Sequence, residues 1–142
     1  MFLEVGTALG YQAERTFSPQ APTDGVWLTR HQVAELDRIP FAAIEVLVSE
    51  VWDAKSIRGS ISTLRDAVSA SLGILLVHEG ELHRVLSERN WADAAIDKEI
   101  NRITGEVARL AAPYSGVEVW TFAKLAEIYR QTTGKKSRYC VK

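Results

Sequence analysis

One carboxylate, that of Glu45, lies within the aliphatic run IEVLVSE at residues 44–50. The isoleucine and valine content of this run predicts a buried strand. A carboxylate in such a strand is costly unless it is paired, hydrogen-bonded or bound to a metal ion. Because side chains alternate along a strand, Glu45 shares its face with Ala43, Leu47 and Ser49. The small side chains of Ala43 and Ser49 leave room beside Glu45 for a partner.

The surrounding pattern places this strand in a small mixed sheet of about five strands flanked by helices, in the α/β class. Strands are expected at residues 11–17, 26–29, 41–49, 72–79 and 117–120, and helices at residues 2–9, 56–68, 81–112 in two pieces and 121–130, with one or two further helical turns at 31–39. Residues 41–79 form a β–α–β unit, so its two strands should be parallel neighbours joined by a right-handed crossover.

Four residues are expected to mark the ends of these elements. Ser56, Asn90 and Thr121 are candidate N-caps, because their side-chain oxygens can accept a hydrogen bond from a free backbone N–H of the first helical turn. Gly80 is expected to end the strand at 72–79.

The order helix, strand, strand with Asp, strand with Glu, crossover helix and strand resembles the core of the PD-(D/E)XK, or restriction-endonuclease-like, nuclease superfamily. In that superfamily an acidic residue opens the second core strand, and an E-x-K motif on the third strand helps to bind one or two divalent ions. Asp24, in TDGVW, matches the first half of this motif, and Glu45 matches the glutamate of the second half. Leu47 stands where the motif has its lysine. The resemblance covers about residues 1–79.

The resemblance implies a divalent-metal-dependent nuclease, with DNA as the expected substrate. Asp24 and Glu45 would hold Mg²⁺ or Mn²⁺, which neutralises phosphate charge and lowers the pKa of a bound water. Lys55, just before the crossover helix, is the expected substitute for the missing lysine. Glu4, in the first helix, sits where many members place an auxiliary acid. Arg58 is expected to hold phosphate, since its planar fork can bind two oxygens.

Each of these residues also has a plainer interpretation. Asp24 precedes a glycine and suits a turn. Glu45 could reach solvent or pair with Arg38 or Lys55. Glu4 places a negative charge near a helix N-terminus, where it is favourable. Lys55, like Arg58, could be a surface cation at the start of a helix.

The missing lysine leaves other functions open. A catalytically inactive protein of the same fold could serve as a binding or assembly module, and Leu47, the small size and the near-zero net charge favour this alternative. An unrelated small α/β domain is the third alternative, and it predicts that Asp24 and Glu45 lie far apart.

Other classes of site are disfavoured. No two of the three histidines have the i, i+4 spacing of a helical zinc motif, and the single cysteine excludes both an intrachain disulfide and a cysteine-based zinc site. No glycine-rich phosphate loop and no G-x-S-x-G motif is present. Among the tryptophans, Trp27 and Trp120 are expected in the core. Trp52 is expected at the surface near the site, where it could stack on a base or pack at the rim.

The 142 residues, 46% hydrophobic and 25% charged, predict a single soluble domain at residues 1–134 and a basic tail at residues 135–142. No apolar run is long enough for a membrane span and no signal peptide is recognisable, so a cytoplasmic location is expected. The net charge of −1 means that nucleic acid would bind a local patch, for example Lys135, Lys136, Arg138 and Lys142 in the tail. A homodimer would cover exposed apolar surface and would suit cleavage of two strands.

Overall fold

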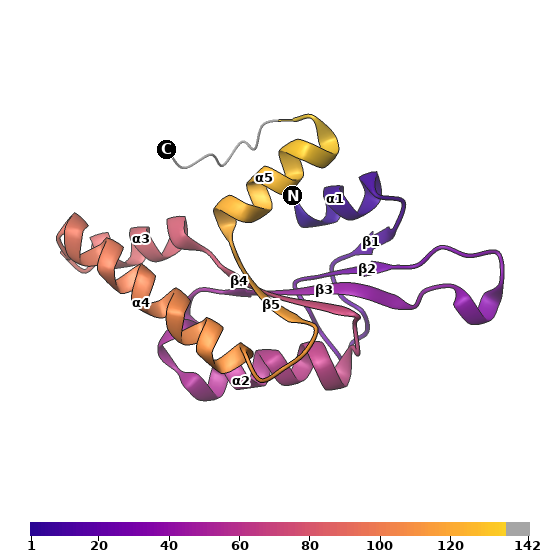
Figure 1. Ribbon diagram of the computed structural model, residues 1–142, viewed down its shortest axis with the longest axis horizontal. Coiled ribbons are helices and arrows are strands. Elements are labelled where there is room, and N and C mark those ends of the chain that lie inside the picture. The colour runs from indigo at the N-terminus through magenta and orange to yellow at the C-terminus, as the bar shows by residue number, and fades with distance from the viewer. Residues whose placement is uncertain (136–142) are drawn as a thin grey trace.

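The computed structural model describes residues 1–135 and shows a five-stranded mixed sheet with helices on both faces (Figure 1). The strands lie side by side in chain order: β1 (Gln12–Glu14), β2 (Gly25–Leu28), β3 (Pro40–Leu47), β4 (Leu72–Val77) and β5 (Val117–Thr121). β1, β2 and β3 pair antiparallel, whereas β4 pairs parallel with both β3 and β5. The predicted α/β class and mixed sheet are confirmed; the restriction-endonuclease-like assignment stays a prediction. Most of the predicted basic tail, residues 136–142, lies outside the described residues.

Five α-helices cover the two faces of the sheet. They are α1 (Phe2–Ala8), α2 (Ala54–Ser62), α3 (Glu79–Glu88), α4 (Asp93–Ala111) and α5 (Phe122–Thr133). Two short 3-10 turns, η1 (Ala34–Leu36) and η2 (Ser49–Trp52), lie on either side of β3, and a π-helical turn, η3 (Thr63–Ala67), continues α2. Helices α1 and α5 lie on one face, and α2 and α4 lie on the other (Figure 1). None of the helices in residues 1–135 is both long and apolar enough to cross a membrane.

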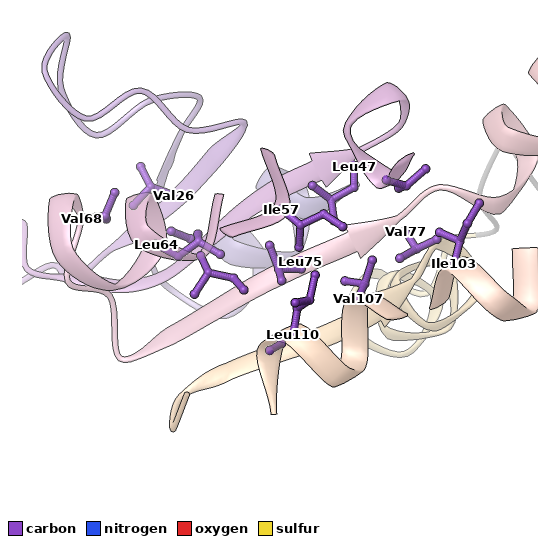
Figure 2. Close-up of a cluster of buried hydrophobic side chains, with 14 of the residues drawn as sticks. Val26, Leu47, Ile57, Leu64, Val68, Leu75, Val77, Ile103, Val107 and Leu110 are labelled. Atoms are coloured by element: carbon purple, nitrogen blue, oxygen red, sulfur yellow. The ribbon is translucent and has the colours of Figure 1, made fainter. Parts of the chain in front are cut away.

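The sheet separates two hydrophobic cores because successive side chains of each strand point to opposite faces. β4 contributes to both: Leu75 and Val77 pack beneath α2 and α4, whereas Ile74 and Leu76 pack beneath α1 and α5. Figure 2 shows the first of these cores, in which Leu75 and Val77 lie among side chains of α2 and α4. This double burial explains why β4 is a continuous aliphatic run in the sequence.

One predicted helix cap is confirmed and two are wrong. The Lys124 backbone N–H donates to Thr121 Oγ1 at 3.1 Å, so Thr121 caps α5 as expected. Ser56 does not cap α2, because Asp53 precedes the helix and its Oδ1 accepts from the Lys55 backbone N–H at 3.1 Å. The Ser56 hydroxyl instead donates to Asp53 at 2.7 Å from inside the helix. Asn90 does not cap α4 either. It lies in the turn before that helix, where its backbone is left-handed with φ of 63°.

Gly80 is not the residue that ends the strand at 72–79. β4 already ends at Val77, and α3 begins at Glu79, so Gly80 lies inside the helix. His78 is the cap, since its ring Nδ1 accepts a hydrogen bond from the Glu81 backbone N–H at 3.2 Å. The boundary between β4 and α3 is therefore formed by His78 and not by Gly80.

Candidate functional site

The register of β2 on β3 brings Asp24 and Glu45 together. Gly25 pairs with Ile44, and the Asp24 backbone N–H donates to the Ile44 carbonyl at 3.1 Å, so Asp24 lies across from Glu45 just beyond the start of β2. Residues directly opposite in an antiparallel pair have their side chains on the same face. For Asp24 and Glu45 this is the face covered by α2 and α4.

The Asp24 side chain accepts a β3 backbone hydrogen bond for which β2 offers no backbone acceptor. β2 begins at Gly25, and the Val46 backbone N–H of β3 donates to Asp24 Oδ2 at 2.7 Å. A backbone N–H without a partner would be unfavourable there, and the carboxylate satisfies it. The orientation of the Asp24 carboxylate is therefore fixed by the backbone of the strand that carries Glu45. This contact with β3 is a structural role other than the turn expected of Asp24, and it is compatible with the position of Asp24 beside Glu45.

Glu45 is half-buried, and its pKa is raised to about 8. Burial is the largest cause, followed by the negative charge of Asp24, a hydrogen bond with Asp24 and the negative charge of Glu50. Each of these causes favours the protonated form of Glu45, and none of them comes from a cation. At neutral pH a proton on Glu45 therefore compensates the charge and can be donated to Asp24.

The alternative in which Glu45 pairs with a basic side chain is wrong. The Arg38 guanidinium binds Glu14 instead, with nitrogen–oxygen distances of 3.0 and 3.1 Å. Within residues 1–135, Glu45 has no ion-pair partner at all. The carboxyl groups of Asp24 and Glu45 thus lie side by side, and no cation of residues 1–135 pairs with Glu45.

Glu50 is a third acid at this place that the sequence analysis did not select. The Val48 backbone N–H donates to Glu50 Oε2 at 3.0 Å, and the Glu50 charge contributes to the raised pKa of Glu45. The sequence signal for Glu50 was its position just after the buried strand that carries Glu45. Even so, no group of three or more His, Cys, Asp or Glu side chains in residues 1–135 has the geometry to hold a metal ion.

Asp24 and Glu45 by themselves fit one kind of cation. Mg²⁺ keeps several of its waters and is commonly held by one or two carboxylates together with substrate oxygens. Two hard oxygen donors with no nitrogen or sulfur beside them suit such an ion better than zinc. Asp24 and Glu45 are therefore a candidate two-carboxylate site for Mg²⁺ or Mn²⁺.

Neither of the two basic residues expected at the site is among the groups that act on Glu45. The Lys55 ammonium is exposed and acts on Asp53, whose pKa it helps to lower, and it is not among the groups that act on Glu45. The Arg58 charge acts on Glu106 of α4. α2 therefore directs Lys55 toward its own N-terminus and Arg58 toward α4.

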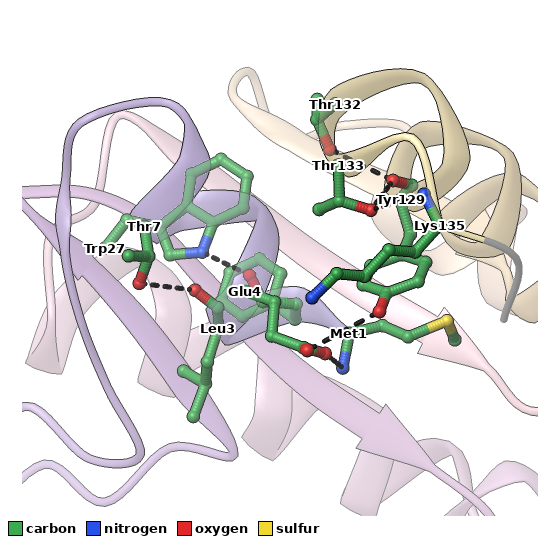
Figure 3. A network of polar contacts seen from close by, with 10 residues as sticks. Met1, Leu3, Glu4, Thr7, Trp27, Tyr129, Thr132, Thr133 and Lys135 are labelled. Atoms are coloured by element: carbon green, nitrogen blue, oxygen red, sulfur yellow. Dashed lines mark hydrogen bonds and ion pairs between the residues drawn. The ribbon is translucent and has the colours of Figure 1, made fainter. Parts of the chain in front are cut away.

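Glu4 lies on the opposite face of the sheet from Glu45. Its carboxylate is 3.3 Å from the Met1 amino group, and the Tyr129 hydroxyl of α5 donates to it at 3.5 Å. Figure 3 shows these contacts between α1 and α5. Glu4 thus joins the two helices of the other core, and the structure does not bring it to Asp24 or Glu45.

Leu47, in the position of the expected lysine, is only 1% exposed. It packs in the core beneath α2 beside Ile57 (Figure 2), in the cluster that also contains Val51. Helix α2 covers the place that a lysine of an E-x-K motif would occupy. The leucine at this position is thus matched by apolar packing around it.

The chain matches none of the protein-family models, curated proteins or solved structures with which it was compared.

Proposed function

We propose that this protein is a divalent-metal-dependent phosphodiesterase that acts on nucleic acid, with DNA as the expected substrate. Asp24 and Glu45 hold the ion, Mg²⁺ or Mn²⁺. The observation that carries the proposal is the apposition of these two carboxylates across β2 and β3, with no cation of the described chain beside them. The order of strands and helices through β4 also agrees with the arrangement that the nuclease resemblance implies.

In this proposal the protein positions one ligand, Asp24, and the other, Glu45, must be deprotonated. Val46 orients Asp24 through the hydrogen bond to Oδ2, so this ligand is held before the ion arrives. Glu45 has to lose its proton in order to bind, because the ion and the proton compete for the same oxygens. The bound ion would neutralise phosphate charge and lower the pKa of an attacking water.

Charge-neutral variants of the two ligands test this proposal. Asp24→Asn keeps an oxygen for the Val46 N–H, and Glu45→Gln imitates the protonated side chain, so both variants should fold. With Mn²⁺ at about pH 8.5, each should cleave DNA at least about 100-fold more slowly than the wild type, the upper end of the loss expected for a group that only supports a metal ligand. Glu35→Gln, an exposed acid in the β2–β3 connection, is the matched control and should cleave normally.

Two results would contradict the proposal. One is the absence of cleavage of single- or double-stranded DNA and RNA by the wild type with either Mg²⁺ or Mn²⁺. The other is full activity of Glu45→Gln in a preparation free of contaminating nuclease.

Burial of Leu47 favours a second candidate, a non-catalytic binding or assembly module of the same fold. The absence of Lys55 from the groups around Glu45 points the same way. Isothermal titration with Mn²⁺ at about pH 8.5 separates the candidates, because the module needs no metal ion. A homodimer, in either case, stays a prediction.

A further inference from the structure

Trp52 lies at the same end of β3 as the acid pair and, like Trp91, is an exposed tryptophan. It is the last residue of η2, and 38% of its surface is accessible. Glu50, whose charge acts on Glu45, is two residues away, which limits the separation of their Cα atoms to roughly 7 Å. An indole is therefore available to solvent just after the end of β3, the same end of the strand at which Asp24 and Glu45 lie.

Two polar contacts orient this indole. The Arg89 guanidinium carbon lies 5.3 Å from the centre of the ring, within the range of a cation–π interaction. The second is with Glu99 of α4: the pKa of this carboxyl is lowered chiefly by Arg102, whose Nε donates to Glu99 Oε2 at 3.0 Å, and to a smaller extent by Trp52. The ring is thus held between the end of α3 and α4 before any ligand binds.

Arg89, the residue that follows α3, differs from the arginines within α3 and α4. The others bind a carboxylate on their own helix, three or four residues away: Arg84 with Glu81 and Glu88, Arg102 with Glu99, and Arg109 with Glu106. Arg89 makes no ion pair with any residue in the range 1–135. Its N–H donors therefore remain available to an anion while its plane lies over the indole.

We infer that Trp52 and Arg89 form a stacking site for an unpaired base of single-stranded nucleic acid, next to the phosphodiester presented to Asp24 and Glu45. This inference rests on the proposed function for the role of the acid pair. Every base has a π-face, so the site accepts any sequence, and the guanidinium can bind a phosphate oxygen of the same strand. Bases inside a duplex already stack on one another, so the substrate is a single strand or a duplex with an unpaired segment.

Binding to the full chain in EDTA tests the site without cleavage. The probes are a fluorescent oligothymidylate of about a dozen nucleotides and a duplex of the same length, followed by anisotropy. The wild type should prefer the single strand. Trp52→Ala should weaken binding by about 10-fold, in line with the loss of one stacked base, and Trp52→Phe should weaken it less because an aromatic plane remains.

Arginine variants supply the matched control. Arg89→Ala should weaken binding about 3- to 10-fold, whereas Arg84→Ala, which removes an equal charge from the same helix, should change it less than about 2-fold because Arg84 is already paired. Circular dichroism and thermal unfolding verify that each variant is folded. A purely structural Trp52–Arg89 contact would lower stability and leave the affinity of the folded protein unchanged.

Three outcomes would overturn the inference: no binding of the single strand, equal affinity for the duplex, or unchanged binding by folded Trp52→Phe and Arg89→Ala. Failure of the proposed function looks different. In that case single-strand binding in EDTA depends on Trp52, but no metal ion supports cleavage. If instead cleavage depends on Asp24 and Glu45 while Trp52 has no effect, the stacking site fails and the proposed function stands.

Discussion

At the scale of single residues, Glu45 couples the stability of the fold to its proposed chemistry. Its pKa is raised to about 8 from an ordinary value of 4.5, chiefly because it is buried and lies beside Asp24. Between these two pH values the folded protein holds a proton that the unfolded chain has lost. The free energy of unfolding must therefore fall as pH rises through this window and become constant above it.

Glu45→Gln should remove this dependence. At about pH 9 the variant should be more stable than the wild type by about 1–3 kcal/mol, well below the full value of the shift because Glu45 is only half-buried. At about pH 5 the two proteins should unfold alike, since Glu45 is then protonated in the folded wild type. Urea unfolding at both pH values measures the difference.

Mn²⁺ provides the complementary measurement on the same two proteins. A cation bound to Asp24 and Glu45 should stabilise the wild type at about pH 9 and leave Glu45→Gln unchanged, because ligand binding to the folded state adds to stability. If the free energy of unfolding depended on pH in the same way for the wild type and Glu45→Gln, Glu45 would not be the titrating group.

At the scale of elements, the packing of α1 on β2 depends on a glycine. The Trp27 indole N–H donates to the Phe2 carbonyl at 2.9 Å, and the Phe2 ring stacks on the indole with 4.5 Å between centroids. A Cβ atom added at Gly6 would collide with the Trp27 ring. Helix α1 therefore lies close to the sheet only because residue 6 has no side chain.

Gly6→Ala should destabilise the protein by about 1–3 kcal/mol, although alanine favours helix more than glycine does, because overpacking outweighs the gain in propensity. Gly105→Ala in α4 is the matched control, since nothing lies within 4 Å of its added Cβ. This control should stabilise the protein by about 0.5–1 kcal/mol. Thermal or urea unfolding of both variants measures the contrast, and equal effects would contradict the packing argument.

At the scale of the whole molecule, opposite charges nearly cancel, so no overall positive field attracts nucleic acid to the surface. The net charge is −1, and most arginines of the helices are paired with glutamates of their own helix. Binding at Trp52 and Arg89 should depend on stacking more than on phosphate contacts.

The salt dependence of single-strand binding should accordingly be shallow. One or two phosphate contacts predict a slope of about −0.7 to −1.4 for the logarithm of the association constant against the logarithm of salt concentration. Anisotropy titrations over a range of NaCl concentrations measure it. A slope of about −3 or steeper would show that several other cations bind the strand and would assign the main contact to a different surface.

Much of the fold could be predicted from local pattern. The buried strands β3 and β4 are continuous aliphatic runs, and the apolar residues of α4 recur with helical spacing, so the mixed sheet and the parallel neighbours followed from short segments. The N-cap of α2 was harder to predict from the sequence than the strands were. Asp53 and Ser56 are both good capping residues, and only the geometry of the turn after η2 decides that Asp53 accepts from the Lys55 N–H.

The sequence by itself determined the class of the fold, the two-sided burial of β4 and the presence of an acid in β3, because each depends on residues close together in the chain. Only the tertiary structure decided how Glu45 is surrounded. The strand register placed Asp24 opposite Glu45, and the packing of α2 on the sheet buried Leu47. The pKa of Glu45 sums burial and charge from segments far apart in the sequence, and no local pattern contains that sum.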